Sequence, residues 1–228
     1  MDFTNKNLLL LFEWGGEKIY LTQTLLATWI VMAVLILFAV IVRLRLSSFK
    51  DVPKGFQNAV ESVVELMTNF TKSTMGEELE GFSGIFFSIF AFILLSNYSS
   101  LIGLRPPTSD LATTAALALT AFVLIHATGI RKLKGGYFKE YLSPYPIFLP
   151  INLLGELSKP ISLCFRLFGN VLGGLIIMGL VYQMLPFALR FILPDVLHLY
   201  FDLIVGALQA YIFTVLSMTF IQLKTVRQ

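Results

Sequence analysis

Long apolar stretches separated by short polar connections dominate the pattern along this chain. A helix that crosses a membrane needs roughly 20 largely apolar residues, at about 1.5 Å of rise each. Four stretches meet this requirement, and a fifth lies within a longer segment. We therefore predict an all-α polytopic membrane protein whose single domain fills residues 1–228, with an outer segment at 1–19, spans at 20–42, 82–104, 109–130 and 196–223, and a long helix at 147–185.

A different periodicity occupies the connection at residues 51–77. Charged residues such as Lys54, Glu61 and Glu65 fall between apolar side chains that recur at spacings of three and four, namely Phe56, Val60, Val63, Val64, Met67 and Phe70. This spacing is typical of an amphipathic helix. We expect the helix to lie in the membrane interface as an anchor, with its apolar face in lipid or against the other helices.

Composition excludes a soluble domain. Hydrophobic residues make up 56% of the 228 residues and charged residues only 14%, and the mean hydropathy is +0.78. A soluble domain of this length needs far more polar surface. The 17 Lys and Arg and 14 Asp and Glu form no basic patch with interleaved aromatics, which argues against nucleic acid as a partner. The single Cys164 excludes an internal disulfide and a cysteine metal cluster, and we expect no cofactor.

Basic residues mark one side of the membrane. They follow the first, third and last predicted spans, at Arg43, Arg45, Lys50, Lys54, Arg131, Lys132, Lys134, Lys224 and Arg227. The opposite connections, around 105–110 and 190–195, carry one arginine each. By the positive-inside rule, we predict an outer N-terminus, five crossings and a cytoplasmic C-terminus.

The long segment at 147–185 does not fit an upright helix. Its stretch from 151 to 185 would measure roughly 52 Å as a helix, against a hydrocarbon thickness of about 30 Å. Either the helix is strongly tilted, or Pro160 breaks it into an interfacial piece and a spanning piece. Both alternatives place Arg166 below the membrane surface.

Arg166 lies on a face of this helix that is polar or small throughout. The positions that share this face are Gly155, Lys159, Ser162, Gly169, Asn170 and Gly173, with Gly174 at its edge. Small residues allow another backbone to approach closely, and an arginine within the membrane needs a counter-charge or a hydrated cavity. Snorkelling to the surface is not available, because Phe165, Leu167 and Phe168 flank the arginine. The face is therefore a candidate ionic contact surface.

The last predicted span carries a second polar face. Asp195, His198, Asp202, Gly206 and Gln209 are spaced three, four, four and three residues apart, from the outer end to about the middle of the membrane. Two acids and a histidine on one face form a candidate hydrated path for a cation. Asp202, about two turns inside, is the stronger candidate; His198 could instead be an interfacial hydrogen-bonding residue.

The strings "LSKPISLCFRLFGNVLGG", "LQAYIF" and "PPTSDLATTAALAL" resemble subunit a of the bacterial F-type ATP synthase. The resemblance covers nearly the whole chain. It implies a non-catalytic stator in the bacterial inner (plasma) membrane, with two half-channels and a long, tilted helical hairpin that faces a rotating ring of c subunits. It also implies as partners the c ring, the b-subunit peripheral stalk and the remaining complex. Arg166 matches the family's essential arginine, Asn170 its asparagine, and Gln209 the glutamine of the last helix.

One position departs from the family pattern. Many members have an ionisable residue nine positions after the arginine, paired with a second one on the last helix, whereas this chain has Leu175 and Asp202. Either Asp202 works with Asn170, His198 and water to carry protons, or the ion is sodium, for which oxygen ligands suffice. On the cytoplasmic side, Glu156 and Ser162 could line the second half-channel, or Glu156 could simply pair with Lys159.

Three other classes of function were compared with this one. An ion-coupled secondary transporter normally shows repeated halves, and no internal repeat is visible here. An intramembrane aspartyl hydrolase needs acids from two helices, whereas Asp195 and Asp202 share one. A passive membrane scaffold is the third alternative. The stator remains the preferred prediction, with the transporter and the scaffold as alternatives.

Overall fold

The computed structural model describes residues 7–14, 17–134, 136–141, 145–184, 186 and 193–225. Within this part, five helical stretches are long and apolar enough to cross a membrane: Gln23–Ser48, Glu77–Ile102, Leu111–Leu133, Pro146–Met184 and Val196–Thr225. The prediction of an all-α polytopic membrane protein is therefore confirmed.

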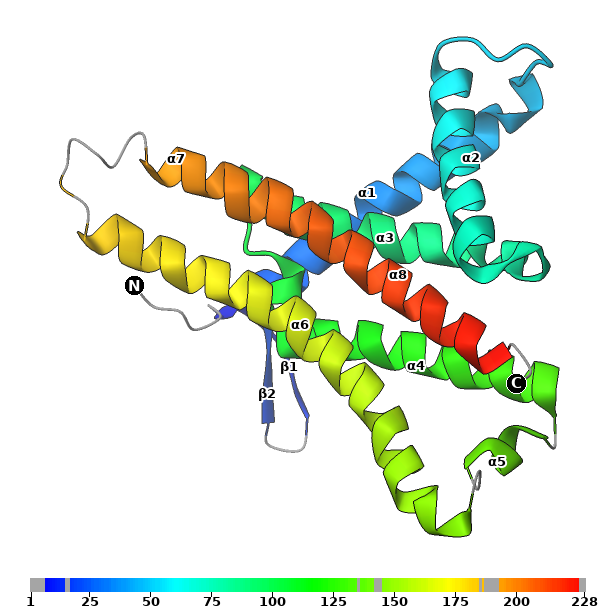
Figure 1. Ribbon diagram of the computed structural model, residues 1–228. Helices are drawn as coiled ribbons and strands as arrows, with labels where there is room; N and C mark the ends of the chain where they lie inside the picture. Colours follow the sequence, from blue (N-terminus) through cyan, green and yellow to red (C-terminus); the bar gives the residue numbers. More distant parts are fainter. Residues whose placement is uncertain are drawn as a thin grey trace. The chain divides into compact units, whose positions relative to one another are not determined.

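A β-hairpin precedes the first span, and the hydrophobic pattern did not predict it. The strands β1 (Asn7–Trp14) and β2 (Glu17–Thr22) pair antiparallel and lead into α1 (Gln23–Arg45) (Figure 1). The hydroxyl oxygen of Thr22 caps α1 by accepting a hydrogen bond from the backbone N–H of Leu25 at 3.3 Å. The helix begins at 23 instead of 20 because the preceding residues belong to β2.

The predicted interfacial helix at 51–77 is shorter than expected. The structure has α2 (Phe56–Met75), preceded by Gly55 with a φ of 56°. A positive φ is not helical, so the helix cannot begin before this glycine. Met67 is buried, whereas Val63 and Val64 on the apolar side are each 50% exposed. An exposed apolar face of this kind suits contact with lipid or another subunit.

The remaining elements follow in the order of the predicted spans. They are η1 (Leu46–Ser48), η2 (Glu77–Phe82), α3 (Ser83–Tyr98), η3 (Ser99–Ile102), η4 (Pro107–Ser109), α4 (Leu111–Leu133), α5 (Gly136–Tyr141), η5 (Pro146–Phe148), α6 (Leu149–Met184), α7 (Leu193–His198), η7 (Leu199–Val205) and α8 (Gly206–Thr225). The last three form one helical stretch, of which η7 is π-helical. The wider turn was not predicted, and it changes the register that an uninterrupted α-helix would have.

The long helix α6 continues through Pro160 (Figure 1). Of the two sequence alternatives, a clean break at this proline is therefore wrong. At about 1.5 Å of rise per residue, its 36 residues measure roughly 54 Å, well beyond the hydrocarbon thickness of about 30 Å. The strong tilt of this helix in a membrane remains a prediction.

The chain divides into two compact units. The first comprises Met1–Ser47, Ala91–Thr113 and Leu167–Ala210, and the second comprises Ser48–Phe90, Thr114–Arg166 and Tyr211–Gln228. The helices α3, α4, α6 and α8 contribute residues to both units. Each unit has its own cluster of polar side chains, and the two clusters are described separately below.

In the second unit, a buried carboxylate binds two lysines. Oε1 of Glu156 on α6 lies 2.8 Å from Nζ of Lys159 and 2.8 Å from Nζ of Lys224 near the end of α8. Glu156 is 8% exposed and Lys224 is 5% exposed. Nζ of Lys224 also lies 4.8 Å from the centre of the Tyr141 ring and 5.7 Å from that of Tyr137, a cation–π arrangement. This cluster joins α5, α6 and α8.

The phenol of Tyr137 remains neutral in this cluster. Burial is the main cause that raises the pKa of Tyr137, and its hydrogen bond with Tyr141 adds to the effect. Glu156 is therefore the carboxylate that balances the two lysines. The pairing also bears out one of the two sequence interpretations of Glu156, that it binds Lys159.

We predict that Glu156→Gln destabilises the protein more than Lys224→Met does. The first change leaves two ammonium groups beside a neutral amide, at a cost of about 3 kcal/mol, whereas after the second Glu156 still has Lys159. Thermal unfolding of the purified chain in detergent measures the difference. The matched control is Glu78→Gln, because Glu78 pairs with Lys132 at 2.6 Å but its side chain is 84% exposed. Equal melting temperatures for the Glu156 and Glu78 variants would contradict a buried ionic cluster.

Candidate functional site

The polar residues of the first unit include a histidine and an aspartate on the last helical stretch. Nδ1 of His198, at the end of α7, lies 2.6 Å from Oδ2 of Asp202 in η7. Nε2 of the same ring lies 3.2 Å from the hydroxyl oxygen of Tyr182 on α6. The side chains of His198 and Asp202 are 34% and 16% exposed, so both retain some access to solvent. His198 and Asp202, which the sequence places on one helix face, are thus in direct contact.

A large cavity of about 510 Å³ adjoins these residues. Its polar lining comprises Gln23, Ser100, Arg105, Tyr182, His198 and Asp202. Apolar residues from α6, such as Leu172 and Met178, complete the wall. A cavity of this size can hold many waters, because one water occupies about 30 Å³ in the liquid. Titratable side chains therefore face a space that can be hydrated.

A small cavity of about 20 Å³ lies further along the same stretch. Nδ2 of Asn170 on α6 donates a hydrogen bond to Oε1 of Gln209 on α8 at 2.7 Å, and both residues line this cavity. Gln209 is 3% exposed, and its Nε2 has no hydrogen-bond partner among the described residues. The space is large enough for a single water, which could satisfy that amide. Asn170 and Gln209, which the sequence analysis selected separately, thus form one hydrogen-bonded pair.

Asp202 belongs to the lining of both cavities. Leu175 and Gly174 are also shared, together with Ser100 and Pro106. An acidic side chain therefore stands where the large cavity meets the small one. In order, the polar path runs from His198 through Asp202 to the Asn170–Gln209 pair, which matches the order predicted along the last span.

Asn97, which the sequence analysis did not select, fixes the end of the π-helical segment. Its Nδ2 donates to the carbonyl oxygen of Gly206 at 2.9 Å, and its Oδ1 accepts from the hydroxyl of Thr108 at 2.7 Å. A Cβ atom at Gly206 would lie 3.0 Å from Cβ of Asn97, so the two helices approach closely here. The role of Gly206 on this face is therefore to allow the close approach of Asn97. The sequence could have indicated Asn97, because it is the single Asn within the apolar stretch at 82–104 and polar residues inside spans are rarely without a partner.

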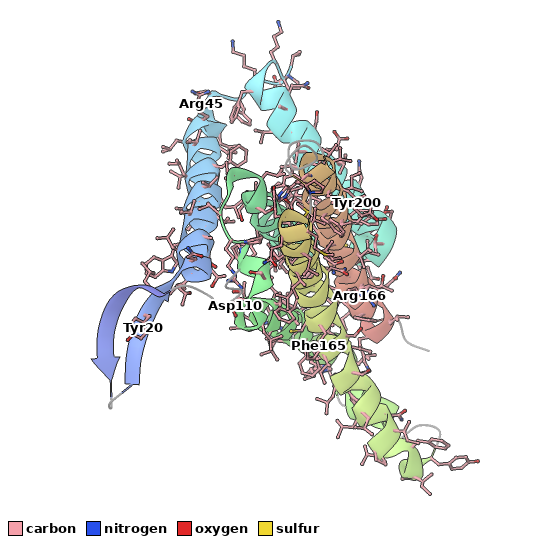
Figure 2. The ribbon with its side chains drawn as sticks, turned by 90° about the vertical axis from the view of Figure 1, so that its left-hand side faces the viewer. Tyr20, Arg45, Asp110, Phe165, Arg166 and Tyr200 are labelled. Atoms are coloured by element: carbon pink, nitrogen blue, oxygen red, sulfur yellow. The ribbon has the colours of Figure 1, made fainter. Side chains whose placement is uncertain are left out.

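Arg166 and Gly169 are exposed, and Gly173 is partly exposed. Arg166 lies on α6 (Figure 2), and no ion pair or hydrogen bond is found for it within the described part of the chain. A Cβ atom at Gly169 or Gly173 would meet no atom within 4 Å. Gly174 differs from the prediction, because it is buried and a Cβ there would contact Phe201 at 3.7 Å. Gly174 therefore packs within this chain.

The other predicted residues fall in separate places. Ser162 is exposed on α6, and Glu156 lies in the buried ionic cluster. Asp195 is part of α7, but its side chain lies outside the described residues. Tyr182, which completes the contacts of His198, gave no sequence signal, because an aromatic residue near the end of an apolar helix is ordinary.

Comparison with known proteins gives a consistent answer. The family model described as ATP synthase A chain matches residues 25–222. The chain is 37% identical to the ATP synthase subunit a of Moorella thermoacetica over 213 residues, which is 92% of this chain and 93% of that protein. It is also 37% identical to the ATP synthase subunit a 2 of Acaryochloris marina and to the chloroplastic ATP synthase subunit a of Stigeoclonium helveticum, each over 92% of this chain and 87% of the relative. The chain therefore belongs to the ATP synthase A chain family.

Proposed function

We propose that this chain is the ion-translocating stator subunit of an F-type ATP synthase. It would couple ion flow through two half-channels to rotation of a c ring, while ATP chemistry takes place elsewhere in the complex. The observation that carries the proposal is the polar path from the large cavity through Asp202 to the Asn170–Gln209 pair. Membership of the ATP synthase A chain family supports the same function.

The large cavity would be the outer half-channel. Asp195, near the start of the last helical stretch, would raise the local concentration of cations, and Asp202 would be the innermost acid on the path. Among the described residues, neither cavity has a lining residue on α8 beyond Gln209. This supports a path that ends near Gln209, as an offset half-channel requires.

Arg166 would face the c ring. A charged arginine at the centre of a membrane helix costs roughly 2.5–3.5 kcal/mol or more, so its exposed guanidinium requires a counter-charge from a partner. A carboxylate of the ring would supply it after releasing its ion, and the fixed positive charge would block direct leakage between the half-channels. The open space at Gly169 and Gly173 supports a close approach of another helix.

The rest of the assembly follows from the same role. Ser162 would line the cytoplasmic half-channel, with Glu156 at its side. The tilted α6 would form a hairpin with the last helical stretch against the ring, and α2 would lie in the interface. The b-subunit stalk and the remaining complex would be the other partners, in a bacterial plasma membrane with the N-terminus outside. The driving energy is about 2.3 kcal/mol per charge for each 100 mV of membrane potential.

Of the two candidate ions, the proton suits the polar residues of the first unit better than sodium does. Sodium needs several oxygen ligands, but Oδ2 of Asp202 is bound to His198, and Oε1 of Gln209 is bound to Asn170. The free amide atom at the small cavity, Nε2 of Gln209, is a donor and cannot coordinate a cation. An imidazole bonded to a carboxylate is, in contrast, a common means of proton transfer.

We predict that Arg166→Ala abolishes ion-driven ATP synthesis and leaves the complex assembled, because the charge serves transport and its removal relieves a burial cost. Arg166→Lys should also fail or nearly fail, since a buried lysine can lose its proton whereas an arginine effectively cannot. ATP synthesis by reconstituted vesicles measures both. Retention of most coupled activity by the lysine variant would refute the argument from permanent charge.

We also predict that Asp202→Asn strongly slows transport, because the amide cannot titrate, whereas Asp195→Asn costs little. ATP-driven pumping across a sodium series, with and without a protonophore, identifies the ion. Sodium-independent pumping that the protonophore collapses is the expected result. If Asp202→Asn recovers at high sodium, the ion is sodium, and full activity of this variant under every condition would remove Asp202 from the path.

A further inference from the structure

We infer that Tyr182, His198 and Asp202 form a hydrogen-bonded proton relay, with Tyr182 as its outermost member. The inference rests on the proposed function and deepens it, because it names the groups that pass the ion from the large cavity to the small one. The sequence pattern suggested His198 and Asp202 as members of a path, but it assigned nothing to Tyr182.

The three side chains make a continuous chain of contacts between two helical stretches. The Tyr182 hydroxyl oxygen on α6 lies 3.2 Å from Nε2 of His198, and Nδ1 of His198 lies 2.6 Å from Oδ2 of Asp202. All three residues line the large cavity, and Asp202 also lines the small cavity. The relay therefore begins at one cavity and ends at the other.

The lining of the large cavity leaves few other groups for this task. The guanidinium of Arg105 only donates hydrogen bonds, and Gln23 and Ser100 carry an amide and a hydroxyl rather than an acid or a base. Leu175 lines both cavities, but it cannot exchange a proton. Among the described lining residues, Tyr182, His198 and Asp202 are the groups that make one hydrogen-bonded chain capable of passing a proton.

The bonds of the relay have one consistent direction. In the relay that we infer, the Asp202 carboxylate is the acceptor, so Nδ1 of His198 carries the hydrogen and donates it to Asp202. Nε2 of the neutral ring is then an acceptor, and the Tyr182 hydroxyl donates to it. This arrangement points every donor toward the small cavity, in the direction of ion flow during ATP synthesis.

Proton transfer along this chain balances at each step. A hydronium ion in the large cavity gives a proton to the Tyr182 oxygen as the original hydroxyl proton moves to Nε2, which forms an imidazolium and releases water. The Nδ1 proton then moves to Oδ2 of Asp202, which becomes a neutral acid. Asp202 releases this proton to water in the small cavity, and His198 regains its first tautomer by exchanging protons with water of the large cavity.

The test is the rate of ATP synthesis by the reconstituted holoenzyme with Tyr182→Phe. This change removes the hydroxyl and keeps the ring, so we expect the rate to fall about tenfold while the amount of assembled complex stays the same. The solvent deuterium isotope effect should increase, because proton uptake becomes rate-limiting. Tyr182→His, which restores a group that can exchange protons, should recover part of the rate. A merely structural role for Tyr182 would not change the isotope effect.

The control is Tyr200→Phe. Tyr200 is 52% exposed in η7, and the contact found for its ring is with Phe201, so this variant should keep the wild-type rate and isotope effect. The double variant Tyr182→Phe with His198→Gln provides a second check. Members of one relay act in series, so the double variant should be no slower than His198→Gln alone.

The outcomes separate the relay from the proposed function. A rate for Tyr182→Phe within twofold of wild type, while Asp202→Asn is inactive, would overturn the relay and leave the stator function intact. Wild-type rates in both variants would overturn the path through Asp202 as well. If Tyr182→Phe does not assemble, His198→Gln decides the question, because a wild-type rate and isotope effect in that variant would equally overturn the relay.

Discussion

Hydrocarbon offers no water to a charged or polar side chain, and this constraint governs the whole arrangement. Each polar group inside a span therefore needs a partner or a cavity. Glu156 satisfies this requirement with two lysines, and Asp202 satisfies it with His198 and two cavities. Arg166 is the charged residue that departs from this rule, since it is exposed and has no ion pair or hydrogen bond among the described residues. Such a residue fits a surface that is completed by another subunit.

Periodicity and length were sufficient to predict the membrane fold. Five apolar stretches predicted five helices, because only a helix satisfies its own backbone within lipid. Polar residues within those stretches were equally informative: Asn170, Asp202 and Gln209 were selected from spacing or from resemblance to a family, and the structure places all three around one small cavity. Asn97, which also lines this cavity, was not selected.

Features that depend on contacts between distant segments were not predictable. The π-helical turn η7 has an ordinary apolar sequence, and its end is held by Asn97, which lies more than a hundred residues earlier. The contact of Tyr182 with His198 likewise joins two separate helices. Gly174 was placed by helical spacing at the edge of the polar and small face of α6, yet a Cβ atom there would contact Phe201. In each case, local sequence does not contain the partner that decides the geometry.

The central claim is that an outer hydrated path along the last helical stretch ends near Gln209. Thiol accessibility tests it directly, because the single Cys164 can be replaced by serine to give a cysteine-free chain. Single cysteines at positions 202 and 217 are then exposed to a membrane-impermeant thiol reagent from the outer side of sealed vesicles. The account predicts that the cysteine that replaces Asp202 is labelled rapidly. The cysteine that replaces the buried Ser217 should not be labelled. Equal labelling at both positions, or labelling of position 217 alone, would contradict it.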